Sequence, residues 1–289
     1  MPWDTQQFDR RADYKSETQC QRTSFAFYRA VRDLLPVWAL EDMRTMEVFH
    51  WEDDGQARAF TPPEALLYAL VHDHQQYARY LLHRFSVRAL AQPSRSFRCC
   101  QAARTPHLSV AVRYNRSGIL RLILESAEDF LVGERKDFLD GRGGCAHDAG
   151  GGKTAVHLAC DLARPECLLL LLAHGACPYV GDRAGDTPLD CLLRHVRQGS
   201  ADMRRTHVCL GYLLLFMPKV RYRCKEQLQD KPDLWRSLLG EEAFRWLAGL
   251  APPSLFIQAM QTVARTVPAQ QLDALPDFLK PLDFRLQHK

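Results

Sequence analysis

A self-match at a spacing of 33 residues constrains the fold of this chain more than any other feature. The stretch "KTAVHLACDL" begins one residue before Thr154, and "DTPLDCLLRH" begins one residue before Thr187, 33 residues later. An apolar run at 168–172, followed by Gly175, lies between the two copies. A unit of this length cannot bury its own apolar face, so the period predicts stacked repeats that share one elongated core.

The residues at fixed places in each copy suit a pair of helices. Thr187 is a good helix N-cap, and Pro188 at the first helical position lacks only an N–H that a helix start leaves unpaired. The run 168–172 is apolar all round, as in a helix packed on both sides, and Gly175 is placed to end that helix. With this period and these residues the chain resembles the ankyrin-repeat family. The resemblance implies an all-α ankyrin-repeat solenoid that binds other proteins.

Weaker units flank the well-formed pair. "TPHLSVAVRYNRSGILRLIL" places Thr105 at the offset of Thr154, and "EALLYALVHDHQQYARYLL" places Glu64 there. Their separations of 41 and 49 residues exceed 33, which predicts lengthened loops at 91–104 and 140–153. The predicted order of segments is a disordered lead-in at 1–23, a degenerate N-terminal cap at 24–60, ankyrin repeats at 61–220, a helical connector at 221–251 and a small helical docking segment at 252–289.

The glycine run before Thr154 also allows a second interpretation, a phosphate-binding loop that ends in Lys153. That loop needs a glycine five residues before Gly152, where this chain has His147, and no apolar strand precedes it. Nucleotide hydrolysis is therefore the disfavoured alternative. The ten cysteines lack the C-x2-C pairs typical of zinc sites, so we expect no metal site. No nucleophile, base and orienting group occur at motif spacing, so we expect no catalytic residues, and we expect no other cofactor.

The C-terminal tail carries a candidate docking motif. Ser254, Leu255, Ala259 and Val263 fit the Elongin-binding box. The leucine, alanine and valine are spaced i, i+4 and i+8, which places them on one stripe of a helix that can enter a groove on a partner. Downstream, "LDALPDFLKPL" is similar to a cullin box, through Leu272, Leu275, Pro276 and Leu279.

Both motifs follow the last repeat, as in ankyrin proteins that carry a SOCS box. The resemblance implies a non-catalytic substrate receptor of a cullin–RING ubiquitin ligase, with Elongin B, Elongin C and a cullin of the SOCS-box class, cullin five, as partners. Ala259 stands where cysteine is usual, and Phe278 where a second proline is common. Two alternatives stay open: the tail is an amphipathic cap for the repeats, or the chain is an interaction scaffold without a ligase role.

Residues 74–124 contain nine arginines and no acidic residue, although the whole chain carries a net charge of only +4. Arginine next to aromatic residues is typical of protein interfaces, so this stretch predicts a surface for an acidic target protein. The candidate target-binding residues are Arg84, Arg88, Arg95, Phe97, Arg98 and Arg104. A solvated face balanced by neighbouring repeats is the alternative, and nucleic acid is disfavoured because no nucleic-acid-binding module is recognisable.

The N-terminal residues and the apolar runs indicate where in the cell the protein is expected. The first 23 residues are polar and charged, unlike a secretory signal, and the strongest apolar run, 167–173, is too short to cross a bilayer. We therefore expect a soluble cytosolic protein without membrane insertion.

Overall fold

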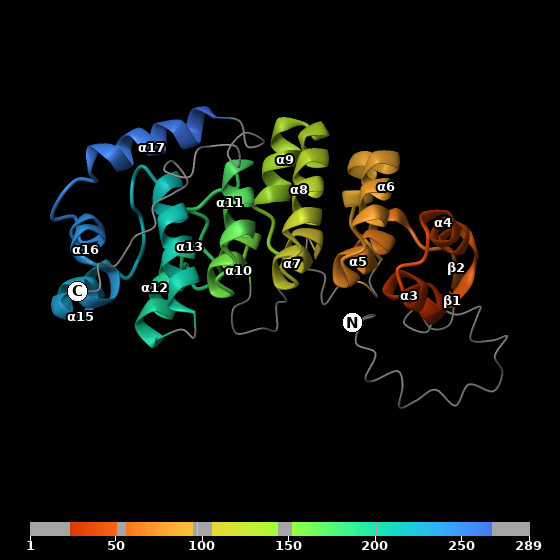
Figure 1. The fold of residues 1–289 in the computed structure, drawn as a ribbon, viewed down its shortest axis with the longest axis horizontal. Helices are drawn as coiled ribbons and strands as arrows, with labels where there is room; N and C mark the ends of the chain where they lie inside the picture. Colours follow the sequence, from red (N-terminus) through yellow and green to blue (C-terminus); the bar gives the residue numbers. More distant parts are fainter. Residues whose placement is uncertain are drawn as a thin grey trace. The chain divides into compact units, whose positions relative to one another are not determined.

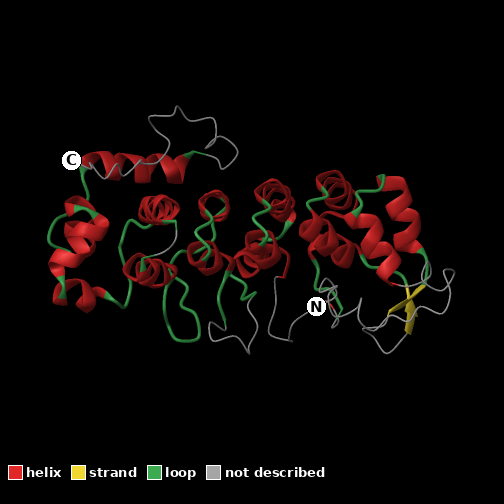
Figure 2. Cartoon of the chain, turned by 60° about the horizontal axis from the view of Figure 1, so that its bottom comes forward, coloured by secondary structure: helices red, strands yellow, loops and turns green. Residues whose placement is uncertain are grey.

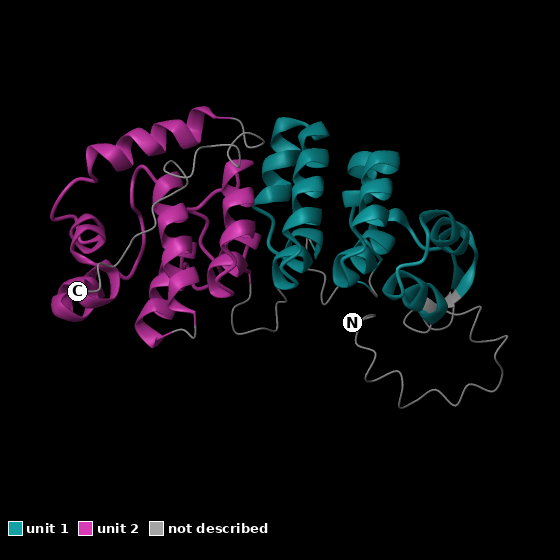
Figure 3. Ribbon diagram, in the orientation of Figure 1, with its two compact units in different colours: residues 1–148 teal, residues 149–289 magenta. Residues whose placement is uncertain are grey.

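The computed structural model describes residues 24–50, 56–94, 97, 106–143, 152–199 and 202–267. Helices dominate these residues (Figure 2), which confirms the predicted all-α class. The chain divides into two compact units, residues 1–148 and 149–289 (Figure 3). In the described part of the chain, no helix combines the length and the apolar character that crossing a membrane requires.

The first unit contains two stacked helix pairs after a short N-terminal group (Figure 1). Its elements are α3 (Ser24–Arg32), α4 (Val37–Thr45), β1 (Val48–His50), β2 (Gln56–Arg58), α5 (Pro62–His72), α6 (Gln75–Phe85), η2 (Ser86–Leu90), α7 (Pro106–Arg113), α8 (Ser117–Ser126), η4 (Ala127–Asp129) and α9 (Val132–Leu139). The first helices α5 and α7 pack together, and the second helices α6 and α8 do the same. The antiparallel hairpin β1–β2 was not expected from the sequence.

An aromatic cluster joins the N-terminal helices to the first helix pair. The rings of Phe27 and Phe60 lie 4.5 Å apart, and Phe97 meets Tyr68 edge-on at 5.2 Å. Phe97 is 1% exposed, so it is a core residue and the expectation that it contacts a target protein is wrong. The physical reason is that burying a large ring against other rings stabilises the fold more than leaving it in water.

The first repeat starts three residues earlier than the sequence offset indicates. Thr61 is the N-cap of α5, and Glu64 completes a capping box with it, whereas the sequence comparison placed Glu64 at the cap itself. The shift arises because α5 has 11 residues while α10 (Ala155–Asp161) has 7. In the first repeat, the second helix therefore begins farther from the cap than it does in the repeat of α10.

The second unit repeats the same arrangement and adds a helical C-terminal group (Figure 1). Its elements are α10, α11 (Pro165–Ala173), α12 (Pro188–Gln198), α13 (Met203–Phe216), α14 (Lys225–Asp230), α15 (Pro232–Leu239), α16 (Glu241–Leu247) and α17 (Leu255–Thr266). Helix α10 packs on α12, α11 packs on α13, and α17 packs on α13.

Thr154 caps α10, as its position in the repeat predicts. The imidazole of His157, at the third helical position, accepts the Thr154 N–H through Nδ1 at 3.2 Å. Its Nε2–H donates to the carbonyl oxygen of Asp186 at 3.0 Å, which ties α10 to the turn that precedes the next repeat. Burial lowers the pKa of His157, in keeping with a neutral ring that accepts at one nitrogen and donates at the other.

Lys153 belongs to this repeat as well. Its ammonium group forms an ion pair with Asp161, at the last position of α10, and its side chain is 18% exposed. Burial opposes the charge, but the hydrogen bond to Asp161 raises the pKa of Lys153. Lys153 and Thr154 are the two residues that suggested a phosphate-binding loop. In the structure Thr154 caps a helix and Lys153 pairs with a carboxylate, so both have structural roles.

Asp190 holds the equivalent position in α12 and is fully buried. Its Oδ2 accepts hydrogen bonds from the amide and the hydroxyl of Thr187, each at 2.8 Å. Its Oδ1 accepts from the amides of Arg223 and Cys224 at 2.8 and 2.9 Å. One carboxylate therefore caps α12 and fixes the chain segment that follows the last repeat.

Candidate functional site

Helix α17 carries the residues of the predicted Elongin-binding box. Ser254 is its N-cap, with a side chain that accepts a hydrogen bond from the amide of Ile257. Ile257, Met260 and Ala264 are buried, and the last two pack with Leu215 of α13. This apolar face anchors the helix in the second unit.

The stripe that the sequence predicts lies on the other side of α17. At about 100° per residue, the positions i, i+4 and i+8 stay on one face, opposite the buried one. Leu255 is 83% exposed, Ala259 is exposed and Val263 is half-buried. Phe256, 47% exposed, adds apolar surface beside Leu255. Leu255 and the small residue Ala259 therefore both lie on the exposed face of α17.

A buried glutamine orients this helix. Gln261 is 4% exposed, and its side-chain amide donates to the carbonyl oxygens of Leu214 at 2.8 Å and Met217 at 3.4 Å. Carbonyl groups at a helix C-terminus have no partner within their own helix, so Gln261 satisfies the end of α13. Sequence reasoning missed this residue, because a polar residue on an amphipathic helix is expected to face solvent.

Replacing Gln261 by leucine is expected to loosen α17 without unfolding the repeats. The change keeps the volume but leaves two carbonyl groups without their side-chain donor, at a loss of about 1–2 kcal/mol in the free energy that holds α17 on α13. Hydrogen exchange of the α17 amides should speed up accordingly. The matched control is Gln258→Leu on the exposed side of the same helix. It removes one exposed bond, from the side-chain amide to the carbonyl oxygen of Pro253 at 2.9 Å, which does not involve α13, so the exchange should change little. Equal acceleration in both variants would contradict the anchoring role.

The predicted cullin-binding residues Leu272, Leu275, Pro276 and Leu279 lie outside the described residues. The same holds for Arg95, Arg98 and Arg104 of the predicted target surface. Arg84, in the last turn of α6, and Arg88, in η2, are exposed. These two positions thus stay candidates for contact with a partner.

Arg116 of the same arginine-rich stretch has a structural role. Its guanidinium donates to the carbonyl oxygens of Leu70 at 3.2 Å and Val71 at 2.9 Å, at the end of α5. It also lies 3.7 Å from the carboxylate of Asp73, the C-cap of that helix. A cation at a helix C-terminus satisfies free carbonyl groups and the helix dipole, so Arg116 joins two repeats.

Three of the buried cysteines have the chemistry of core residues. Burial raises the pKa of Cys167, Cys191 and Cys209 to about 12, so these thiols stay protonated and unreactive near neutral pH. The described ranges contain no group of three His, Cys, Asp or Glu side chains placed to hold one metal ion.

The capped helix pairs, with first helices stacked on first and second on second, define an ankyrin-repeat protein. No model of a known protein family matches the chain. The chain is 48% identical over 326 aligned residues to the mouse (Mus musculus) protein named Ankyrin repeat domain-containing protein 9, and the match covers 98% of each. The chain belongs to the family of that ankyrin-repeat protein.

Proposed function

We propose that this chain is the non-catalytic substrate receptor of a cullin–RING ubiquitin ligase in the cytosol. The ankyrin repeats bind a target protein, the exposed face of α17 docks on Elongin B and Elongin C, and residues 272–279 contact cullin five. The ubiquitin transfer itself is carried out by the recruited partners. Holding the target in the complex raises the effective concentration of its lysines near the ubiquitin-conjugating enzyme.

The observation that carries the proposal is the two-faced packing of α17. One face is anchored by Ile257, Met260 and Gln261, and the opposite face leaves Leu255 83% exposed. A helix held in this way presents its apolar stripe with little further loss of conformational entropy on binding. Ala259, one turn after Leu255, leaves space for a partner helix to approach closely.

A second candidate function is an interaction scaffold in which α17 only closes the repeat stack. Met260 and Ala264 favour it, since they cover Leu215 and Phe216 of α13 and so shield the end of the array. This capping uses the face opposite the exposed stripe. The two candidates therefore differ in what Leu255 does, and Leu255 is the residue to change.

Capture of purified Elongin B–Elongin C complex by the full chain tests the proposal. Leu255→Ala is expected to weaken binding about thirtyfold, because loss of a central interface anchor removes about 2 kcal/mol. Ala259→Phe, which fills the approach space, should weaken binding to a similar degree. Cullin five should be captured by wild type only when the Elongin complex is present.

The matched control is Leu250→Ala, since Leu250 is also exposed, at 60%, but precedes α17. It should leave Elongin binding within about twofold of wild type, as expected for a residue outside the interface. If wild type does not bind the Elongin complex, or if Leu255→Ala and Leu250→Ala behave alike, the scaffold function is the correct one.

A further inference from the structure

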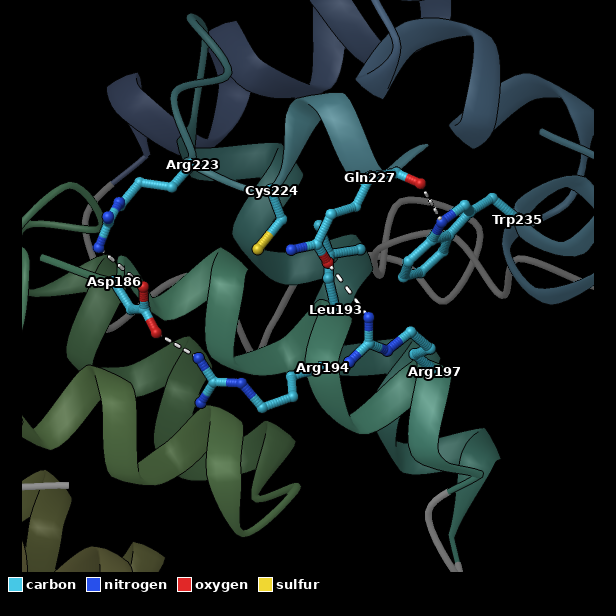
Figure 4. A pocket seen from close by; sticks show the side chains of 8 residues that line it. All are labelled: Asp186, Leu193, Arg194, Arg197, Arg223, Cys224, Gln227 and Trp235. Carbon is cyan, nitrogen blue, oxygen red and sulfur yellow. Dashed lines mark hydrogen bonds and ion pairs between the residues drawn. The ribbon is translucent and has the colours of Figure 1, made fainter. Parts of the chain in front are cut away.

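A second arginine cluster lines a cavity of about 350 Å³ in the C-terminal unit (Figure 4). Three segments meet there: the turn before α12, the second half of α12, and the stretch from Arg223 to α15. Arg194 and Arg197 come from α12, Arg223 from the segment after the repeats, and Trp235 from α15. The lining residues of 186–197 and those of 223–235 are separated along the chain, so no local motif indicates the cavity.

The lining carries more positive than negative charge. Arg194 and Arg223 both form ion pairs with Asp186, the one acidic residue among those that line the cavity (Figure 4). The side chains of the two arginines are 41% and 61% exposed, so they still reach solvent. A single carboxylate cannot neutralise three guanidinium groups. The cavity therefore attracts an anion.

The buried carboxylate of Asp190 beneath this region does not remove the excess. Its described hydrogen bonds come from Thr187 and from the amides of Arg223 and Cys224, and none comes from a guanidinium group. Asp161, whose charge also acts on Arg194, is itself paired with Lys153. Counting Asp190 and the Asp161–Lys153 pair therefore still leaves more positive than negative groups at the cavity.

Hydrogen bonds hold the cationic groups in place. The Trp235 indole N–H donates to the carbonyl oxygen of Gln227 at 3.0 Å, and the Gln227 side chain accepts from Arg197 Nη1 at 3.3 Å. Arg223 also donates to the carbonyl oxygen of Ala184 in the turn before α12. Side chains that are already oriented lose little entropy when they bind a ligand.

A purely structural role accounts for only part of the cluster. Arg223 and Arg194 fix the turn through Asp186, which explains those two residues without a ligand. Arg197 is different: in the described part of the chain it donates to Gln227 and forms no ion pair. Among the described residues, Arg197 is thus an exposed arginine that lines the same cavity as Arg194 and Arg223 but pairs with no carboxylate, and this observation points to a ligand.

We propose that this cavity binds an acidic segment of a partner protein through its aspartate or glutamate side chains. The planar guanidinium group matches a carboxylate with two parallel hydrogen bonds. A volume of about 350 Å³ exceeds one ionic group and lies at the lower end for binding pockets, which suits one or two side chains of an extended segment. Only the identity of the partner rests on the proposed function: if the chain is a substrate receptor, the acidic segment belongs to the ligase target.

Fluorescence anisotropy of a fluorescein-labelled hexaglutamate peptide, titrated with the full chain, tests the site. Arg197→Glu is expected to weaken binding about tenfold, because one charge-assisted contact is lost and a repulsive one is gained. Arg197→Gln, a milder change, should weaken it about threefold. The matched control is Arg204→Glu, an exposed arginine on α13 outside the cavity, which should stay within twofold of wild type.

Three results would overturn the assignment: no binding of the peptide to wild type, equal losses in Arg197→Glu and Arg204→Glu, or displacement of the peptide by equimolar inorganic phosphate. The last result would indicate a general anion site. Circular dichroism establishes that each variant is folded. Elongin capture, measured on the same variants, should be unchanged by Arg197→Glu, so failure of this site and failure of the ligase function are told apart.

Discussion

Replacing Asp190 by alanine is expected to lower the free energy of unfolding of the C-terminal unit by about 3 kcal/mol. The substitution removes the carboxylate that accepts from Thr187 and from the amides of Arg223 and Cys224. Those groups are left without an acceptor at a position where Asp190 is fully buried, so water cannot replace it cheaply. Urea unfolding followed by circular dichroism measures the change.

Two further variants separate the hydrogen bonds from charge alone. Asp190→Asn keeps one acceptor oxygen and should lose roughly half as much stability. Asp233→Ala removes a carboxylate with a side chain that is 94% exposed and paired with Arg236 at 3.0 Å. An exposed ion pair contributes little, so this change should stay below about 1 kcal/mol. Equal losses for Asp190→Ala and Asp233→Ala would contradict the role given to Asp190.

The same carboxylate makes stability depend on pH. Burial alone would raise the pKa of Asp190, but hydrogen bonds from Thr187 and Cys224 hold it below the ordinary value of 3.8. A group with a lower pKa in the folded state stabilises the fold above the unfolded pKa, and this contribution is lost as the pH falls through the folded pKa. The stability difference between wild type and Asp190→Asn should therefore be constant near neutral pH and shrink below about pH 4.

Periodicity predicted the repeats best where a cap and a helix lie at standard spacing. Thr154 and Thr187 both cap the helices expected of them. The prediction missed the start of α5, because a longer first helix shifts the second helix relative to the cap. It also missed the β1–β2 hairpin, since strands of three residues are too short to show an alternating pattern.

Side-chain roles were harder to predict than helices. The stripe through Leu255 follows from spacing alone, because one helix determines it. Phe97 and Arg116 stand in the same arginine-rich stretch as Arg84, yet Phe97 is in the core and Arg116 bonds the end of α5. Burial and long-range partners decide these roles, and neither is contained in the local sequence. The cavity beside Arg197 is missed for the same reason, because residues 186–197 and 223–235 meet only in the folded chain.

Polar residues in the first turn of the repeats emerge as the groups that join neighbouring segments. His157 bonds the Asp186 carbonyl, and Asp190 accepts from the amides of Arg223 and Cys224. Glu64 has this role in the N-terminal unit: its carboxylate accepts from the amides of Thr61 at 2.9 Å and Ser94 at 3.4 Å. Local capping and the connection between segments are thus provided by one side chain, which makes such positions sensitive to substitution.

Replacing Glu64 by alanine is accordingly expected to destabilise the N-terminal unit by about 3 kcal/mol. Its fully buried carboxylate also pairs with Arg58 at 2.8 Å, and the substitution would remove this ion pair from an arginine that is 26% exposed. Burial would raise the pKa of Glu64, but Arg58, Ser94 and Thr61 hold it below the ordinary value.

The matched control is Glu134→Ala. Glu134 occupies the same third helical position in α9 but is exposed, so the loss of stability should stay below about 1 kcal/mol. Urea unfolding distinguishes the two, and similar losses would mean that helix capping, rather than the buried network, stabilises this unit.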